Sequence, residues 1–173
     1  MRKIILGCAV TLDGFIEGPN GEYDWCFTDG DYGMQDFLKS IDAILYGRKS
    51  YDLMKKLEAQ GENPFKDFKS YVFSRTKQPN TAGVEWISEN VYEEVMKLKQ
   101  MPGKDLWLFG GASLSTEFFN LGLVDRLWLS VHPILLGSGK YLFNDIQKRI
   151  PLKLIDSKPY DSGLVALTYD VIH

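Results

Sequence analysis

The chain of 173 residues has few of the groups from which metal sites and disulfide frameworks are built. Its two cysteines, Cys8 and Cys26, and its two histidines, His132 and His173, lie far apart, and neither pair has the spacing of a metal site. This argues against a zinc site and against a histidine-based catalytic triad. Cys8 lies in an apolar run and is typical of a small core residue. We expect reduced thiols and a cytoplasmic location, although the sequence leaves one disulfide open.

The chain also lacks an excess of one charge and a long hydrophobic run. It has 20 Lys and Arg residues against 23 acidic residues, and its net charge of −3 argues against a nucleic-acid partner. No apolar run reaches the ~18 residues of a membrane-spanning helix, so no membrane is expected. The apolar start of the chain resembles a signal peptide, but Asp13 and Glu17 follow closely and favour a buried strand. Without repeats or long linkers, a single domain over residues 1–173 is expected.

Strand and helix patterns alternate along the first 121 residues. Apolar runs predict strands over 3–10, 43–46, 71–73, 84–87 and 105–109. Helical periodicity predicts helices over 34–41, 48–57, 91–98 and 112–121. Alternating patterns then predict strands at 127–131, 152–157 and 164–172. The alternation implies parallel strands with helices on both faces, and the tail implies antiparallel strands at one edge, so the sequence predicts a three-layer α/β domain with a mixed sheet.

Three local patterns add detail to this prediction. Asn90 and Glu93 have the spacing of a capping box at the start of the third helix. In the fourth helix, Leu114, Phe118 and Leu121 lie on one face. Residues 11–33 are rich in glycine and predict a long irregular loop, a kind of segment that is usually functional or mobile.

The first strand-to-helix junction with unusual chemistry is Gly47-Arg48-Lys49-Ser50. A glycine ends the strand, and two cations and a hydroxyl occupy the first helical turn. The backbone N–H groups and the dipole of a helix N-terminus favour an anion, and the two cations add to this field. The junction therefore predicts an anion site, with a solvated basic turn as the alternative.

Two further junctions carry similar signals. Gly110-Gly111-Ala112-Ser113 follows a buried strand, where paired glycines allow a phosphate to approach the backbone and Ser113 is able to cap the helix. The carboxyl ends of strands are where open α/β sheets bind ligands. Ser74-Arg75-Thr76 follows another strand and suits a ribose phosphate, although a polar surface turn is an equal alternative.

Other motifs do not match known sites. Gly137-Ser-Gly139-Lys140 lacks the hydroxyl and the first glycine of a P-loop, and no G-x-G-x-x-G follows a strand. The acidic residues of the 11–33 loop do not match an EF-hand, although a single buried carboxyl among them would suit a proton donor. Trp25 and its aromatic neighbours either stack on a flat ligand or hold the loop in place.

Four motifs in order resemble the dihydrofolate reductase-like superfamily. They are Thr11-Leu-Asp-Gly-Phe-Ile16, Tyr46-Gly-Arg-Lys-Ser-Tyr51, Phe109-Gly-Gly-Ala-Ser113 and Pro133-Ile-Leu-Leu-Gly-Ser-Gly139. The likeness is specifically to small stand-alone members akin to the C-terminal reductase domain of the riboflavin-biosynthesis protein RibD. It implies an eight-stranded mixed sheet, NADPH as cofactor and hydride transfer from the nicotinamide.

The resemblance also assigns roles along the chain. Ala9 and Ile16 are expected to flank the nicotinamide. The residues expected to hold the phosphates and the adenosine are Gly47, Arg48, Lys49, Ser50, Ser74, Arg75, Thr76, Gly110, Gly111, Ala112, Ser113 and Leu114. Asp31 is the expected proton donor, and Asp13 and Trp25 are expected to contact the substrate.

The substrate side is less well matched. Asp24 stands where dihydrofolate reductases have the proline of a Pro-Trp pair, and of the riboflavin reductase motifs only Lys3 is present. The sequence predicts an NADPH-dependent reductase of a small heterocyclic or sugar-linked substrate. The nearest family activity is 5-amino-6-(5-phosphoribosylamino)uracil reduction, and dihydrofolate reduction is the second. A non-catalytic NADPH-binding sensor is the alternative of another class, and a homodimer is expected because family members often form one.

Overall fold

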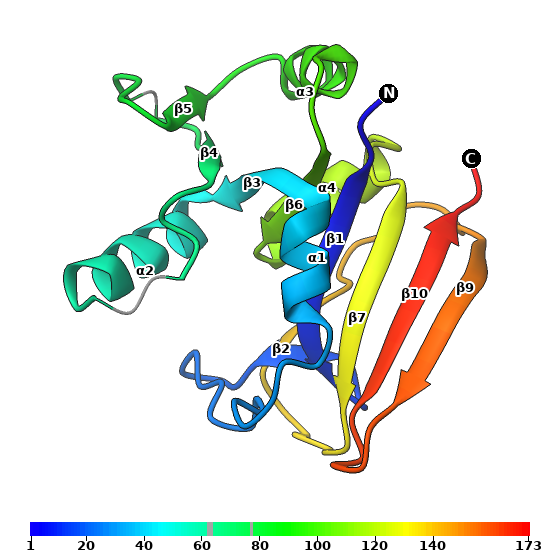
Figure 1. The fold of residues 1–173 in the computed structure, drawn as a ribbon. Coiled ribbons are helices and arrows are strands. Elements are labelled where there is room, and N and C mark those ends of the chain that lie inside the picture. The colour runs from blue at the N-terminus through cyan, green and yellow to red at the C-terminus, as the bar shows by residue number, and fades with distance from the viewer. Residues whose placement is uncertain (62–63, 77) are drawn as a thin grey trace.

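An eight-stranded sheet forms the centre of the computed structural model, which describes residues 1–61, 64–76 and 78–173 (Figure 1). Its strands, in spatial order, are β5 (Val84–Ile87), β4 (Lys69–Phe73), β3 (Ile41–Gly47), β6 (Asp105–Gly110), β1 (Ile4–Thr11), β7 (Arg126–His132), β10 (Val165–Val171) and β9 (Leu152–Pro159). The first six are parallel, and β10 and β9 are antiparallel additions at one edge. The predicted mixed sheet, with its antiparallel C-terminal strands, is confirmed.

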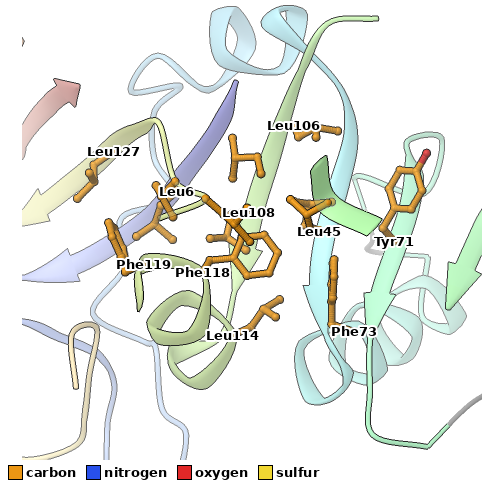
Figure 2. Packing of buried hydrophobic residues seen from close by; sticks show 14 of the residues in the cluster. Leu6, Leu45, Tyr71, Phe73, Leu106, Leu108, Leu114, Phe118, Phe119 and Leu127 are labelled. Atoms are coloured by element: carbon orange, nitrogen blue, oxygen red, sulfur yellow. The ribbon is translucent and has the colours of Figure 1, made fainter. Parts of the chain in front are cut away.

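Four helices cover the two faces of this sheet. They are α1 (Met34–Ser40), α2 (Arg48–Ala59), α3 (Val91–Gln100) and α4 (Ala112–Asn120). On one face, α3 and α4 pack on the apolar runs of the central strands, and Figure 2 shows Phe118 and Leu114 of α4 against Leu45 and Leu108. On the other face, α1 contributes Phe37 to a second buried cluster. Helices therefore cover both faces of the central strands, and the three-layer arrangement is confirmed.

Three details of the helices differ from the prediction. Asn90 has a positive φ of 51° and its side chain makes no capping hydrogen bond, so the predicted capping box does not form. In α4 the buried face continues through Phe119, whereas Leu121 follows the helix and is 39% exposed. The N-cap position of α4 is Gly111, which leaves Ser113 exposed in the first turn and not at the cap.

A two-stranded sheet joins β2 (Phe15–Glu17), inside the predicted 11–33 loop, to β8 (Lys140–Tyr141), in a segment for which the sequence predicted no element. Asp13 links the same two segments. Its carboxylate accepts hydrogen bonds from the backbone N–H groups of Leu136 and Gly137 at 3.1 and 2.8 Å. The first and fourth sequence motifs, Thr11–Ile16 and Pro133–Gly139, are therefore far apart in the chain but bound to one another in the fold.

The parallel register brings the carboxyl ends of three strands together. Gly47 at the end of β3 pairs with Phe73 at the end of β4, and Tyr46 pairs with Gly110 at the end of β6. The three junctions singled out in the sequence consequently lie next to one another at the same edge of the sheet.

Candidate active site

The glycine junctions of β3 and β6 meet in direct contact. A Cβ added at Gly47 would lie 3.3 Å from the carbonyl oxygen of Gly110, and the Ser50 hydroxyl accepts a hydrogen bond of 3.1 Å from the N–H of Gly111. Gly110 itself has φ +87°, and a Cβ there would lie 2.7 Å from the Ser115 hydroxyl. Only glycine fits this second position without strain. The two junctions therefore form a closely packed cradle of bare backbone.

Two helices begin at this cradle with their N–H groups free for a ligand. Within the fully described helices α2 and α4, the first turn holds no acidic residue and no side chain caps the N-terminus. Since the N-terminus of each helix carries a partial positive charge, their convergence favours an anion with more than one charge, such as a diphosphate.

Cations and hydroxyls lie beside the cradle. The Arg48 guanidinium Nε donates to both oxygens of Asp52, at 3.0 and 2.8 Å. Its central carbon, Cζ, lies 5.2 Å from the centre of the Trp86 ring. Lys49 is exposed in the next position. On the neighbouring strand end, the Ser74 hydroxyl accepts the N–H of Thr76, which shapes an exposed turn around Arg75. Positive charge is thus available for a phosphate outside the cradle.

A cavity of about 340 Å³ opens alongside this edge of the sheet. Of the predicted site residues, Ala9, Ile16, Ser50 and Gly111 line it. The predicted nicotinamide pair therefore faces the same space as the junction residues. The remaining predicted residues do not line it: Gly47, Arg48, Lys49, Ser74, Arg75, Thr76, Gly110, Ala112, Ser113 and Leu114 belong to the junctions around it.

The three residues predicted on the substrate side lie outside the cavity lining. Asp31 is exposed, and its carboxylate accepts the N–H groups of Gly33 and Gln35 at the start of α1. Partial burial would raise the pKa of Asp13, but hydrogen bonds from Thr11, Gly137 and Leu136 outweigh it and hold the pKa below its ordinary value. These contacts give both carboxylates structural tasks in the loops around the site.

Trp25 packs against a buried histidine. Its ring lies edge-on to His132, with centroids 5.2 Å apart, and its indole Nε1 is buried without a hydrogen-bond partner among the described residues. The Nδ1 of His132 lies 2.9 Å from the Ser130 carbonyl oxygen, and its Nε2 accepts the N–H of Phe27 at 3.1 Å. Burial lowers the pKa of His132, which favours the neutral ring that this pair of contacts requires. Trp25 and His132 therefore hold the 18–33 loop in place.

Most of the cavity wall was not predicted from the sequence as part of a site. It comes from the apolar faces of α1 and α2, from the end of β6 and from β7. Its members include Met34, Leu53, Met54, Leu57, Phe65, Trp107, Phe109 and Trp128. The helical spacing of Met54 and Leu57 was visible, but it is the spacing of any core-facing helix. The bulky aromatics near the strand ends were the one signal available.

The chain belongs to the family of the RibD C-terminal domain, whose model matches residues 2–166. It is 52% identical to the protein YyaP of Bacillus subtilis (strain 168) over 97% of this chain and 94% of that protein. Among solved structures, a protein from Shewanella sp. PV-4 named for riboflavin biosynthesis superposes with a TM-score of 0.85 at 23% identity, covering all of both chains. The dihydrofolate reductase of Enterococcus faecalis, solved with NADP(H), has a TM-score of 0.71 at 15% identity, covering 99% of this chain and 97% of that one.

These comparisons establish the fold as dihydrofolate reductase-like. Within residues 1–61, 64–76 and 78–173, no helix is both long and apolar enough to cross a membrane. The same residues contain no cluster of three or more His, Cys, Asp or Glu side chains placed to hold a metal ion. Both cysteines are free thiols, and burial raises the pKa of Cys8 to about 12.

Proposed function

We propose that the protein is an NADPH-dependent reductase of a small heterocyclic substrate. The observation that carries this proposal is the meeting of two uncapped helix N-termini at a glycine cradle, directly beside a cavity of about 340 Å³. A dinucleotide needs both parts: a site for its diphosphate and an adjoining space for its reactive ring.

The residues present suit such a cofactor. The backbone at Gly47 and over 110–114 would hold the diphosphate, with the Ser50 hydroxyl at its side. Arg48, Lys49 and the turn over 74–76 would bind the 2′-phosphate that distinguishes NADPH from NADH. When bound, the cofactor supplies a hydride. Ala9 and Ile16 would pack against its nicotinamide ring and shield it from water.

Calorimetric titration with NADPH and, separately, with NADH tests the cofactor assignment. We expect NADPH to bind and Arg48→Ala to weaken it at least tenfold, because the variant removes a cation beside the proposed 2′-phosphate. Lys56→Ala is the matched control, since it removes an exposed cation from the same helix away from the junction. Binding of NADH alone would overturn the 2′-phosphate assignment, and binding of neither nucleotide would overturn the reductase proposal.

NADPH oxidation followed at 340 nm separates the candidate activities. Turnover of 5-amino-6-(5-phosphoribosylamino)uracil would identify the nearest family activity, and turnover of dihydrofolate the second. Saturable NADPH binding without oxidation across pterins, pyrimidines and quinones would instead support a non-catalytic NADPH-binding sensor.

A further inference from the structure

The wall of the cavity beyond Ala9 and Ile16 is apolar. Three residues of α2 line it, Leu53, Met54 and Leu57, and Met34 of α1 adjoins them. The rest of this part of the wall is aromatic: Phe65, Trp107, Phe109 and Trp128. Thioether and ring surfaces of this kind bind flat apolar groups by contact and dispersion.

Charge is almost absent from the same wall. Of the described residues that line the cavity, Glu17 is the only charged one, and its carboxylate accepts a hydrogen bond of 2.6 Å from the Lys140 ammonium group. No Lys, Arg or His is part of the described lining. An anionic group placed here would lose its water without gaining a cation, and such transfers are strongly unfavourable.

Some of the polar atoms of the wall already form hydrogen bonds within the protein. The indole Nε1 of Trp107 donates to the carbonyl oxygen of Gly7 at 2.9 Å, and this bond fixes the ring in the wall. The Ser50 hydroxyl accepts the N–H of Gly111. Ser115, Ser130 and Tyr23 are the other hydroxyl-bearing residues of the lining, enough to orient one or two polar atoms of a ligand.

We propose that the substrate is an uncharged, flat aromatic or heteroaromatic compound that carries no phosphate. This inference rests on the proposed function, because it concerns the substrate half of the same cavity. It excludes a phosphoribosyl substrate, for which the wall would have to offer cations. Recognition comes from ring and thioether contacts, with a hydroxyl setting the orientation.

Two probes that differ by one phosphate test this inference: 2-naphthol and 2-naphthyl phosphate. Each is titrated calorimetrically into the full chain, once with excess NADP⁺ to fill the cofactor half of the cavity and once without nucleotide. We expect 2-naphthol to bind at least ten times more tightly than its phosphate. Equal affinity, tighter binding of the phosphate, or binding of neither probe would overturn the inference.

A variant with a charge introduced into the cavity wall provides a second test of the inference. Leu53→Arg introduces a cation at a lining position that is 39% exposed, and it should shift the preference toward 2-naphthyl phosphate at least tenfold. Leu121→Arg is the matched control, because Leu121 is also 39% exposed and does not line the cavity. If both variants leave the preference unchanged, or change it equally, the probe binds elsewhere and the inference is wrong.

The two proposals fail in different ways. If NADPH binds but 2-naphthol does not, the cofactor assignment stands and the substrate class is wrong. If 2-naphthol binds with the expected preference but no nicotinamide nucleotide does, the apolar wall stands as a binding site, and the reductase proposal falls.

Discussion

The substitution Gly47→Ala separates the cofactor cradle from the stability of the fold. Gly47 has φ −71° and ψ 152°, which alanine adopts without strain. Because alanine restricts the unfolded chain more than glycine does, the substitution by itself raises the free energy of unfolding by roughly 0.4–1 kcal/mol. The new methyl group would lie 3.3 Å from the Gly110 carbonyl oxygen and 3.7 Å from the Gly111 nitrogen, a tight contact that opposes this gain. We expect the free energy of unfolding to change by less than about 1 kcal/mol.

The effect on the cofactor should be larger. The methyl group projects between the first turns of α2 and α4, where we place the diphosphate. Displacing one charge-assisted hydrogen bond costs roughly 1.5–3 kcal/mol. This corresponds to a loss of NADPH affinity of about tenfold or more.

Calorimetry with NADPH and urea unfolding of the same preparation measure the two effects side by side. Gly30→Ala is the control, since a Cβ there would also be crowded, 3.1 Å from the Tyr32 ring, in an exposed loop away from the junctions. A Gly47→Ala protein that folds normally and binds NADPH as tightly as the parent would refute the placement of the diphosphate.

Three further predictions concern other parts of the chain. Asp31→Ala should lower the free energy of unfolding by about 1 kcal/mol, as the loss of a helix cap does. It should change kcat/KM for any substrate found by less than about twofold. A large fall in kcat/KM with an altered pH profile would instead support Asp31 as proton donor. Because burial lowers the pKa of His132 below its ordinary 6.5, its contribution to stability is complete above that pH and declines as the pH falls toward the lowered value. Urea unfolding across roughly pH 5 to 8 should show this decline, and His132→Gln should not. The wholly exposed edge strand β9 should form a homodimer interface. Light scattering should therefore give twice the mass of the chain for the parent protein and a monomer for Leu154→Lys. A monomeric parent would contradict this prediction.

Much of the fold was predictable because its signals are local. The continuous apolar run of β1 and the stripe on α4 each report burial within a few residues. The structure confirms the run of β1, and it confirms the stripe at Leu114 and Phe118 but not at Leu121. The β2–β8 pair was missed because strands of three and two residues are too short to show an alternating pattern. The pairing is also accompanied by hydrogen bonds that Asp13 accepts from a segment more than a hundred residues away. The capping box at Asn90 failed because the backbone there turns left-handed, which the spacing does not reveal.

The candidate site was predictable only on its polar side. Paired glycines and adjacent cations are unusual at a strand end, so Gly110, Gly111 and Arg48 stood out from the sequence alone. Met54 and Leu57 did not stand out, because the sequence pattern of an apolar helix face is the same whether another element packs against it or it lines a cavity. That difference depends on what the tertiary structure leaves unfilled between α1, α2 and the ends of β6 and β7.

The same division has a consequence for specificity within this fold. The cofactor end is built from backbone geometry, helix N-termini and strand register, which cannot change without disturbing the sheet. The substrate end is built from side chains of α1, α2 and the strand ends. A chain of this fold is therefore able to keep its cofactor while its substrate changes. Under the proposed function, we therefore expect the residues of the apolar wall, and not those of the cradle, to decide which compound is reduced.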